Sequence, residues 1–323
     1  MRSTILFLPL LILMACSGKS STHKKHSGED SATVATPHQS DSGAVVVSNS
    51  GFHFPYDLKS PETKWKMPKD LTEISAIATY KKSKLVCVQD EAGEIFIYDL
   101  KKGEAKKGVD FGKKGDYEGV ANINDTVYVL SSNGTLHCVS SFDKKDQKTN
   151  DFKTFLNKSN DTEGLCYDSL NNRLLIACKG DPGSSYVGYR AVYGFNLKSK
   201  QLETTPVYLV KLEELKAILL KMDKSKFLGE EWQNIFGDKG DVTFQPSEIA
   251  IHPITHDVYM ISTVGKLLVI LDKSGKLISV QSLPSDELKQ PEGLCFFEDG
   301  TMFISDEGRS GHGNIFQFKY KPE

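Results

Sequence analysis

One short pattern recurs through this chain of 323 residues and limits what it can fold into. In its fullest copy, residues 290–308 (QPEGLCFFEDGTMFISDEG), a Glu precedes an apolar stretch that an Asp-Gly turn joins to a second one. Such paired stretches predict a β-hairpin. The pattern begins at five glutamates: Glu73, Glu118, Glu163, Glu248 and Glu292. Their spacings of 45, 45, 85 and 44 residues predict an array of similar sheets, most often a β-propeller.

The repeats predict an all-β fold of five blades, in which each Glu begins the innermost strand of one blade. The last blade lacks an outer strand before the chain stops, and residues 52–66 can supply it from the other end. Pairing of the two ends would close the ring and remove exposed sheet edges. A sixth blade inside the interval of 85 residues is the alternative.

Residues 212–244 depart from the repeat. Leu212, Leu215, Leu219 and Met222 recur at helical spacing with Lys and Glu between them, so we predict a helical insertion between blades three and four. The outer strand of blade three should end on the same face as the glutamates. We therefore expect the insertion to pack over or beside the channel mouth; helices that fill a gap between blades are the alternative.

The N-terminus predicts export rather than fold. Arg2 precedes an apolar run, residues 5–14, that is too short to span a bilayer, so residues 1–15 are typical of a signal peptide. The end of this run, Leu-Met-Ala-Cys, resembles a bacterial lipobox. That resemblance implies acylation at Cys16, for example by palmitate, and a membrane anchor; Ser17 favours the outer membrane. An ordinary secreted protein is the alternative.

The rest of the chain divides into two parts. Residues 16–50 hold almost no large apolar side chain and predict a flexible tether in the cell envelope, followed by a propeller domain at 51–323. The formal net charge of −2 argues against a nucleic-acid partner, and we expect a monomer. Five further cysteines lie singly in strand patterns and predict buried thiols: Cys87, Cys138, Cys166, Cys178 and Cys295.

The candidate site is acidic. In a propeller, the connections into the inner strands share one face with the loops between second and third strands, so the five glutamates should ring one channel mouth. These loops add further residues to a predicted ligand-binding face: Asp90, Glu91, Asp181, Asp306 and Glu307, with Arg309 and His312 beyond the last of them. The chain is otherwise balanced in charge, so this concentration of carboxylates stands out.

A ring of like charges requires protons, basic partners or a cation, because carboxylates a few ångström apart repel. Oxygen ligands without His or Cys favour Ca²⁺, and we predict the five glutamates as its ligands. The alternative is structural: each Glu accepts backbone N–H groups of the next blade and fastens the ring.

The Glu-Gly openings at Glu118, Glu163 and Glu292, with the segments VQDEAG (residues 88–93) and ISDEGR (residues 304–309), resemble the SdiA-regulated, YjiK-like β-propeller family. The resemblance covers residues 71–320 and implies an exported or membrane-attached propeller. More distantly, the chain is similar to calcium-containing propellers of the phytase, paraoxonase and gluconolactonase groups.

Two classes of function follow. The sequence holds no G-x-S-x-G, H-E-x-x-H or phosphate-binding glycine loop, so the leading hypothesis is a module that binds a small molecule or an envelope component at the acidic face. The alternative is a calcium-dependent hydrolase of lactones, esters or phosphoesters. Its candidate bases are His137, His252 and His312, and no catalytic residue is assigned.

Overall fold

The computed structural model describes residues 47–48, 52–222, 232–233, 235–237, 240–309 and 311–322. The predicted signal peptide, Cys16 and almost all of the predicted tether lie outside these residues. Within the described part of the chain, no helix has the length and apolar character needed to cross a membrane.

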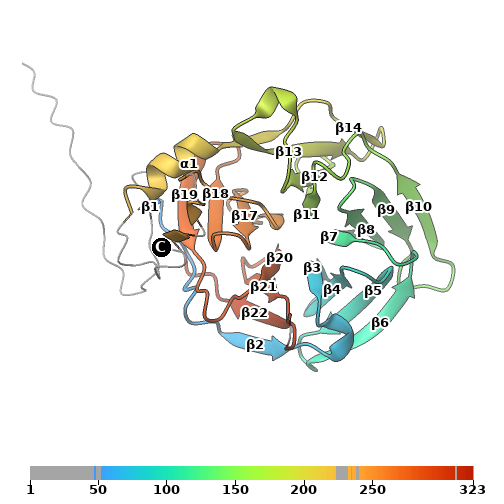
Figure 1. Cartoon of the computed structure of the whole chain (residues 1–323). Helices are drawn as coiled ribbons and strands as arrows, with labels where there is room; N and C mark the ends of the chain where they lie inside the picture. Colours follow the sequence, from blue (N-terminus) through green and yellow to red (C-terminus); the bar gives the residue numbers. More distant parts are fainter. Residues whose placement is uncertain are drawn as a thin grey trace, which may run out of the picture. The chain divides into compact units, whose positions relative to one another are not determined.

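Five antiparallel sheets arranged around a common centre form a five-bladed β-propeller, as predicted (Figure 1). Blade I holds β3 (Ile74–Tyr80), β4 (Lys84–Gln89), β5 (Glu94–Asp99) and β6 (Glu104–Asp110). Blade II holds β7 (Tyr117–Ile123), β8 (Thr126–Ser131), β9 (Leu136–Ser140) and β10 (Lys148–Phe152). Blade III holds β11 (Thr162–Asp168), β12 (Arg173–Cys178), β13 (Tyr189–Asn196), β14 (Gln201–Leu202) and β15 (Tyr208–Lys211).

Blades IV and V complete the ring. Blade IV holds β16 (Glu248–Ile251), β17 (Val258–Ser262), β18 (Leu267–Leu271) and β19 (Leu277–Ser282). Blade V holds β20 (Pro291–Phe296), β21 (Met302–Asp306) and β22 (Asn314–Phe318). The innermost strands follow one another around the centre in the order β3, β7, β11, β16 and β20, and β20 returns to β3.

The segment ahead of the first repeat closes the ring. Strand β2 (Thr63–Lys66) pairs antiparallel with β22 and becomes the outer strand of blade V, which confirms the predicted closure. The indole nitrogen of Trp65 donates to the carbonyl of Leu100 at 3.1 Å and so joins blade V to blade I. A further strand, β1 (Val47–Ser48), pairs with β19 at the outer edge of blade IV and was not predicted.

The core lies between the blades, because each sheet is covered on both faces. All five residues of β17 and all five of β18 are buried, whereas the outer strands β6 and β10 are largely exposed. The five cysteines of the described chain are free thiols, and all but Cys166 are buried. The four buried thiols pack as small apolar residues, as expected, whereas Cys166 is partly exposed.

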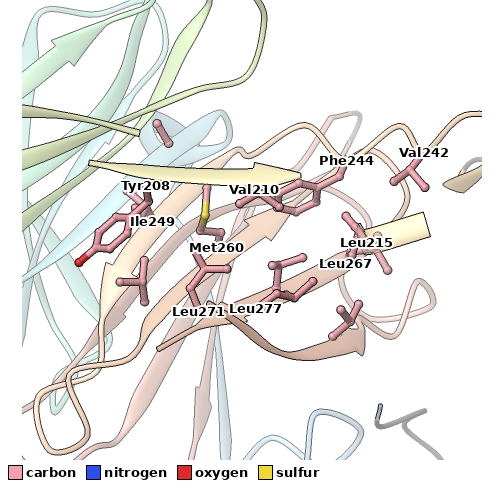
Figure 2. Close-up of a cluster of buried hydrophobic side chains, with 14 of the residues drawn as sticks. Tyr208, Val210, Leu215, Val242, Phe244, Ile249, Met260, Leu267, Leu271 and Leu277 are labelled. Carbon is pink, nitrogen blue, oxygen red and sulfur yellow. The ribbon is translucent and has the colours of Figure 1, made fainter. Parts of the chain in front are cut away.

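The insertion begins with α1 (Leu212–Leu219), which directly follows β15. Its buried Leu215 and Leu219 pack in one apolar cluster with Phe244, Leu267 and Leu277, and Figure 2 shows this cluster around β18 and β19. Because α1 contacts β15 and the outer strand β19, it lies at the rim of the ring. The expectation that the insertion covers the channel mouth is therefore wrong for α1, which fills the gap between blades III and IV.

Candidate functional site

The repeated Glu lies where the pairing of the inner strand is irregular. The register between first and second strands shifts at the Glu in blades II, III and V, whereas in blade I it shifts at Ser75, two residues after Glu73. A β-bulge bends its strand and re-aims the side chain at that point. Glu118, Glu163 and Glu292 are the second residues of their strands, and Glu248 is the first residue of β16.

Four of the five predicted glutamates influence one another and form what we call the glutamate cluster: Glu118, Glu163, Glu248 and Glu292. Burial is the main cause that raises the pKa of all four carboxyl groups. The pKa of Glu118 rises to about 9, with the charges of Glu163 and Asp116 adding to burial. Glu248 is fully buried, and the charges of Glu163 and Glu292 add to its shift.

Glu73 stands apart from this cluster. The chain enters β3 from a 3₁₀ turn (Lys69–Leu71), so Glu73 precedes the strand and its side chain is exposed. Its charge acts instead on Asp90 and Glu307, the acidic loops of blades I and V. The structure thus places the fifth predicted glutamate with the acidic loops, outside the buried group.

A basic residue that the sequence analysis missed, Lys179, belongs to the glutamate cluster. Its Nζ forms an ion pair with Glu163 Oε1, and its side chain is 30% exposed. Burial alone would lower the pKa of Lys179, but the charges of Glu163 and Glu292 outweigh it and the pKa is raised. Lys179 and Glu307 occupy equivalent positions, directly after the second strands of blades III and V. The backbone N–H of Lys179 donates to the carbonyl of Asp161, and that of Glu307 donates to the carbonyl of Gln290. Each acceptor lies two residues before the repeated Glu of its blade.

Glu248 has the structural role that was the alternative to metal binding: it accepts backbone N–H groups and fastens neighbouring blades. Its Oε1 accepts the N–H of Leu165 in blade III at 2.7 Å and that of Ile249 at 2.9 Å, so this carboxylate fastens two blades. Hydroxyl groups fasten other pairs of blades through carbonyl acceptors: Ser75 to Tyr117 at 2.7 Å, Thr162 to Ser131 at 2.8 Å and Ser247 to Pro291 at 2.9 Å. Closure of the ring therefore does not depend on a Glu in every blade.

Two oxygens of the cluster are buried and lack a hydrogen-bond partner among the described residues: Glu163 Oε2 and Glu248 Oε2. Buried polar atoms without partners are costly, so a hydrogen-bond donor or a cation at these two oxygens would be stabilising. Carboxylate oxygens suit Ca²⁺ chemically. Within the described part of the chain, however, no three or more His, Cys, Asp or Glu side chains converge as a metal site.

The acidic loop of blade V is tied to one glutamine. Asp306 Oδ1 accepts the backbone N–H of Gln290 at 2.6 Å, and burial raises the pKa of Asp306 to about 6. The side chain of Gln290 donates to Glu307 and accepts from the guanidinium of Arg309. His312 lies just beyond and is exposed. These contacts hold the loop in place and leave the imidazole of His312 in solvent.

The loops of blades I and III differ from each other. Asp90 is half-buried, its Oδ1 has no partner among the described residues, and burial followed by the charge of Glu73 raises its pKa. Glu91 is exposed and pairs with Lys114 at 3.1 Å. Asp181 is exposed, and its Oδ1 accepts the N–H of Gly183 at 2.8 Å within a turn. Of these three, only Asp90 joins the charges of Glu73 and Glu307.

His252 is a core residue. It is fully buried, its Nε2 lies 2.9 Å from the hydroxyl of Tyr56, and its Nδ1 faces the backbone N–H groups of Ile254 and Thr255. Burial lowers the pKa of this imidazole to about 4. His252 follows the end of β16 opposite to Glu248, so the structure does not bring it to the glutamate cluster.

The raised pKa values predict how stability depends on pH. Burial raises the pKa of the Glu118 carboxyl group to about 9 in the folded state, from an ordinary value of 4.5. Its stabilising contribution is complete below the unfolded pKa and is lost as the pH rises through the folded pKa. In a protein of this size, each kcal/mol of lost stability lowers the melting temperature by roughly 2–4 °C. We therefore expect the melting temperature to fall by about 3 °C or more between pH 6 and pH 9.

Differential scanning calorimetry across this pH range measures the effect. The Glu118→Gln variant cannot ionise at this position, so its melting temperature should change less with pH. A wild-type melting temperature that rises toward pH 9, or a variant with the wild-type slope, would contradict the expectation.

A model of the SdiA-regulated family matches residues 58–310. No curated protein sequence matches the chain. Similar solved structures include a glutaminyl cyclase of Myxococcus xanthus, with 12% identity, 81% of this chain and 96% of that chain covered, and a TM-score of 0.49. A streptogramin B lyase shares 10% identity (80% and 97% covered, TM-score 0.45), and a luciferin-regenerating enzyme 11% (82% and 98% covered, TM-score 0.47). At these identities the likeness is not evidence of activity.

Proposed function

The chain belongs to the SdiA-regulated family, and on that premise we propose that it is a binding module whose glutamate cluster receives a cationic ligand. The observation that carries the proposal is Lys179, an ammonium group already seated against Glu163 within the cluster. A site that holds one ammonium group has the charge and the oxygen acceptors to hold another in its place.

Lys179 acts as the resident counter-ion in this proposal. The cluster holds four carboxyl groups with raised pKa values, and the ammonium group of Lys179 acts on two of them, Glu163 and Glu292, so the cluster can take up more positive charge as its protons leave. Glu163 Oε2 and Glu248 Oε2 offer unpartnered buried oxygens to the incoming cation. Two cations share this chemistry: an organic ammonium group and Ca²⁺, which these two oxygens would help to hold.

The variant Lys179→Met tests the proposal, because it removes the ammonium group that competes for the site and keeps an unbranched side chain only one atom shorter. We expect the affinity for Ca²⁺ or for a small alkylamine, measured by titration calorimetry on chelator-stripped protein, to rise about tenfold or more. The positive charge of Lys179 would repel a cation bound close to it by roughly 1–4 kcal/mol. A gain of about 1.4 kcal/mol in binding free energy corresponds to a tenfold higher affinity. Glu163→Gln should weaken binding of the same cation.

Lys114→Met is the matched control, since Lys114 is exposed and pairs with the surface residue Glu91. Binding of Ca²⁺ alone would identify the ligand as a metal ion, and binding of the amine alone would identify it as an organic ammonium compound. If neither probe binds wild type or Lys179→Met, the proposal fails. Calcium-dependent hydrolysis of lactones, esters or phosphoesters that is lost in Glu292→Gln would replace it with the enzymatic alternative.

We propose in addition that the propeller is anchored in the cell envelope, at the outer membrane, through acylated Cys16. The supporting features are the apolar run before Cys16 and the tether composition after it. Cys16→Ala should move the protein from the membrane fraction to the soluble fraction. Sedimentation of Cys16→Ala with membranes, as in wild type, would refute the anchor.

A further inference from the structure

Three side chains of blade II form a hydrogen-bonded chain outside the glutamate cluster. Ser131 Oγ lies 2.9 Å from His137 Nε2, and His137 Nδ1 lies 2.8 Å from Asp151 Oδ1. The three residues come from consecutive strands: Ser131 ends β8, His137 lies in β9 and Asp151 lies in β10. Of these three residues, only His137 was a candidate from the sequence.

The register of the sheet brings these residues together. His137 pairs with Val129 in β8 and with Asp151 in β10. Side chains two residues apart on a strand share a face, so Ser131 lies on the same face as Val129 and beside His137. The rings of Phe111 and Tyr117 contact the imidazole, with centroids at 5.7 and 5.4 Å. Strand pairing and aromatic packing therefore fix the orientation of the imidazole.

The hydrogen bonds set the roles of the two imidazole nitrogens. An ionised carboxylate can only accept, so Nδ1 carries the proton that is donated to Asp151. In the neutral imidazole, Nε2 is then unprotonated and accepts the hydroxyl proton of Ser131. Such a chain prepares a serine to lose its proton while its oxygen attacks an electrophile.

We propose that Ser131 is a nucleophile toward small activated acyl esters, with His137 as general base and Asp151 as a positioning residue. Ser131 Oγ bonds to the ester carbonyl carbon while its proton passes to His137 Nε2. The tetrahedral intermediate then breaks its bond to the leaving alcohol, which takes that proton. Water attacks the acyl-serine, gives one proton to His137 and releases the carboxylic acid, and His137 returns the proton to Ser131.

Access limits the size of the acyl donor. Ser131 is 6% exposed, and the side chain of His137 is 14% exposed, so we confine the proposal to the smallest acyl donors, such as acetyl esters. The neighbouring Ser132 is about equally buried, at 7%, but its hydroxyl donates to the carboxylate of Asp116 instead of an imidazole. Ser132 is therefore a matched control within the same turn.

The proposal is tested by incubating the full chain with p-nitrophenyl acetate and locating the adduct by mass spectrometry of peptides. We expect acetyl on Ser131, a release of nitrophenol that Ser131→Ala abolishes, and an unchanged release in Ser132→Ala. His137→Gln should slow acylation by about a hundredfold or more, the usual range for loss of a general base. The melting temperature of each variant shows whether it is folded.

Asp151 requires a measurement that a purely structural role would leave unchanged. Asp151→Asn should slow acylation at an unaltered melting temperature, because an amide can donate to Nδ1 and so favour the wrong tautomer. Asp151→Glu keeps the carboxylate and should restore part of the rate. Acetyl on Ser132 or on lysines instead of Ser131, no adduct on Ser131 in wild type, or equal rates in Asp151→Asn and wild type would overturn the assignment.

Discussion

Deleting the residues before Met67 is expected to prevent the propeller from forming a stable closed ring. The deletion removes β2 and leaves β22 as an unpaired edge, which is a template for association with other chains. It also removes Phe54, Tyr56 and Leu58, which are buried between blades IV and V. At roughly 1.5–3 kcal/mol for each large buried side chain, the loss is comparable with the whole stability of a typical protein.

Urea unfolding and size-exclusion chromatography measure this effect. A chain that begins at Val47 keeps β1 and β2 and should unfold at the wild-type midpoint, whereas the chain that begins at Met67 should aggregate. Because the short chain can fail to fold at all, Tyr56 provides a finer measure. Its hydroxyl donates to the carbonyl of Gly300 at 2.6 Å, and its ring is 5% exposed.

Tyr56→Ala should lower the free energy of unfolding by about 3–5 kcal/mol, the usual cost of removing a buried aromatic ring. Tyr56→Phe should lower it by about 1–3 kcal/mol, because the carbonyl of Gly300 and the Nε2 of His252 would each lose the hydroxyl as a partner. A truncated chain that stays monomeric with an unchanged midpoint would contradict this account of closure. So would a Tyr56→Ala variant as stable as wild type.

The ring could be predicted because its evidence is periodic in the sequence. Five similar segments give five blades, and the missing outer strand of the last blade identifies residues 52–66 as its partner. No repeat in the sequence indicates the position of α1 or the presence of strand β1. Helical spacing marks Leu215 and Leu219 as an apolar face, but it does not say that the face packs against the edge of blade IV. Strand β1 is two residues long and carries no periodicity.

The site was only partly predictable for a related reason. Repetition marked the glutamates, but Lys179 occurs once, so the cation that faces them could not be found by looking for repeated acids. The group of Ser131, His137 and Asp151 depends on the register between strands, and their spacing in the sequence resembles no known motif. Glu73 repeats the pattern, yet it lies outside the cluster because it precedes β3, whereas Glu118, Glu163 and Glu292 are the second residues of their strands.

The Gly that follows Glu in blades II, III and V has a packing role that the same repeat explains. A Cβ on Gly164 would lie 2.8 Å from the backbone nitrogen of Ile249 in the next blade. A Cβ on Gly119 would lie 2.6 Å from the carbonyl oxygen of Glu163. Real Cβ atoms do not approach backbone so closely, and two inner strands cannot yield independently in a closed ring. Only Gly allows these strands to pack at this distance.

Gly164→Ala is therefore expected to destabilise the protein by about 3 kcal/mol, the upper part of the usual range for overpacking. Thermal and urea unfolding measure the loss, and Gly188→Ala is the control. Gly188 has a φ of +86° and no atom within 4 Å of its added Cβ, so it reports backbone strain alone, at about 1–2 kcal/mol. Gly164 has no such φ, so its loss would come from contact between blades. A Gly164→Ala variant no less stable than Gly188→Ala would show that the inner strands can move apart, and that the Glu-Gly pair is not needed for close packing at the centre of the ring.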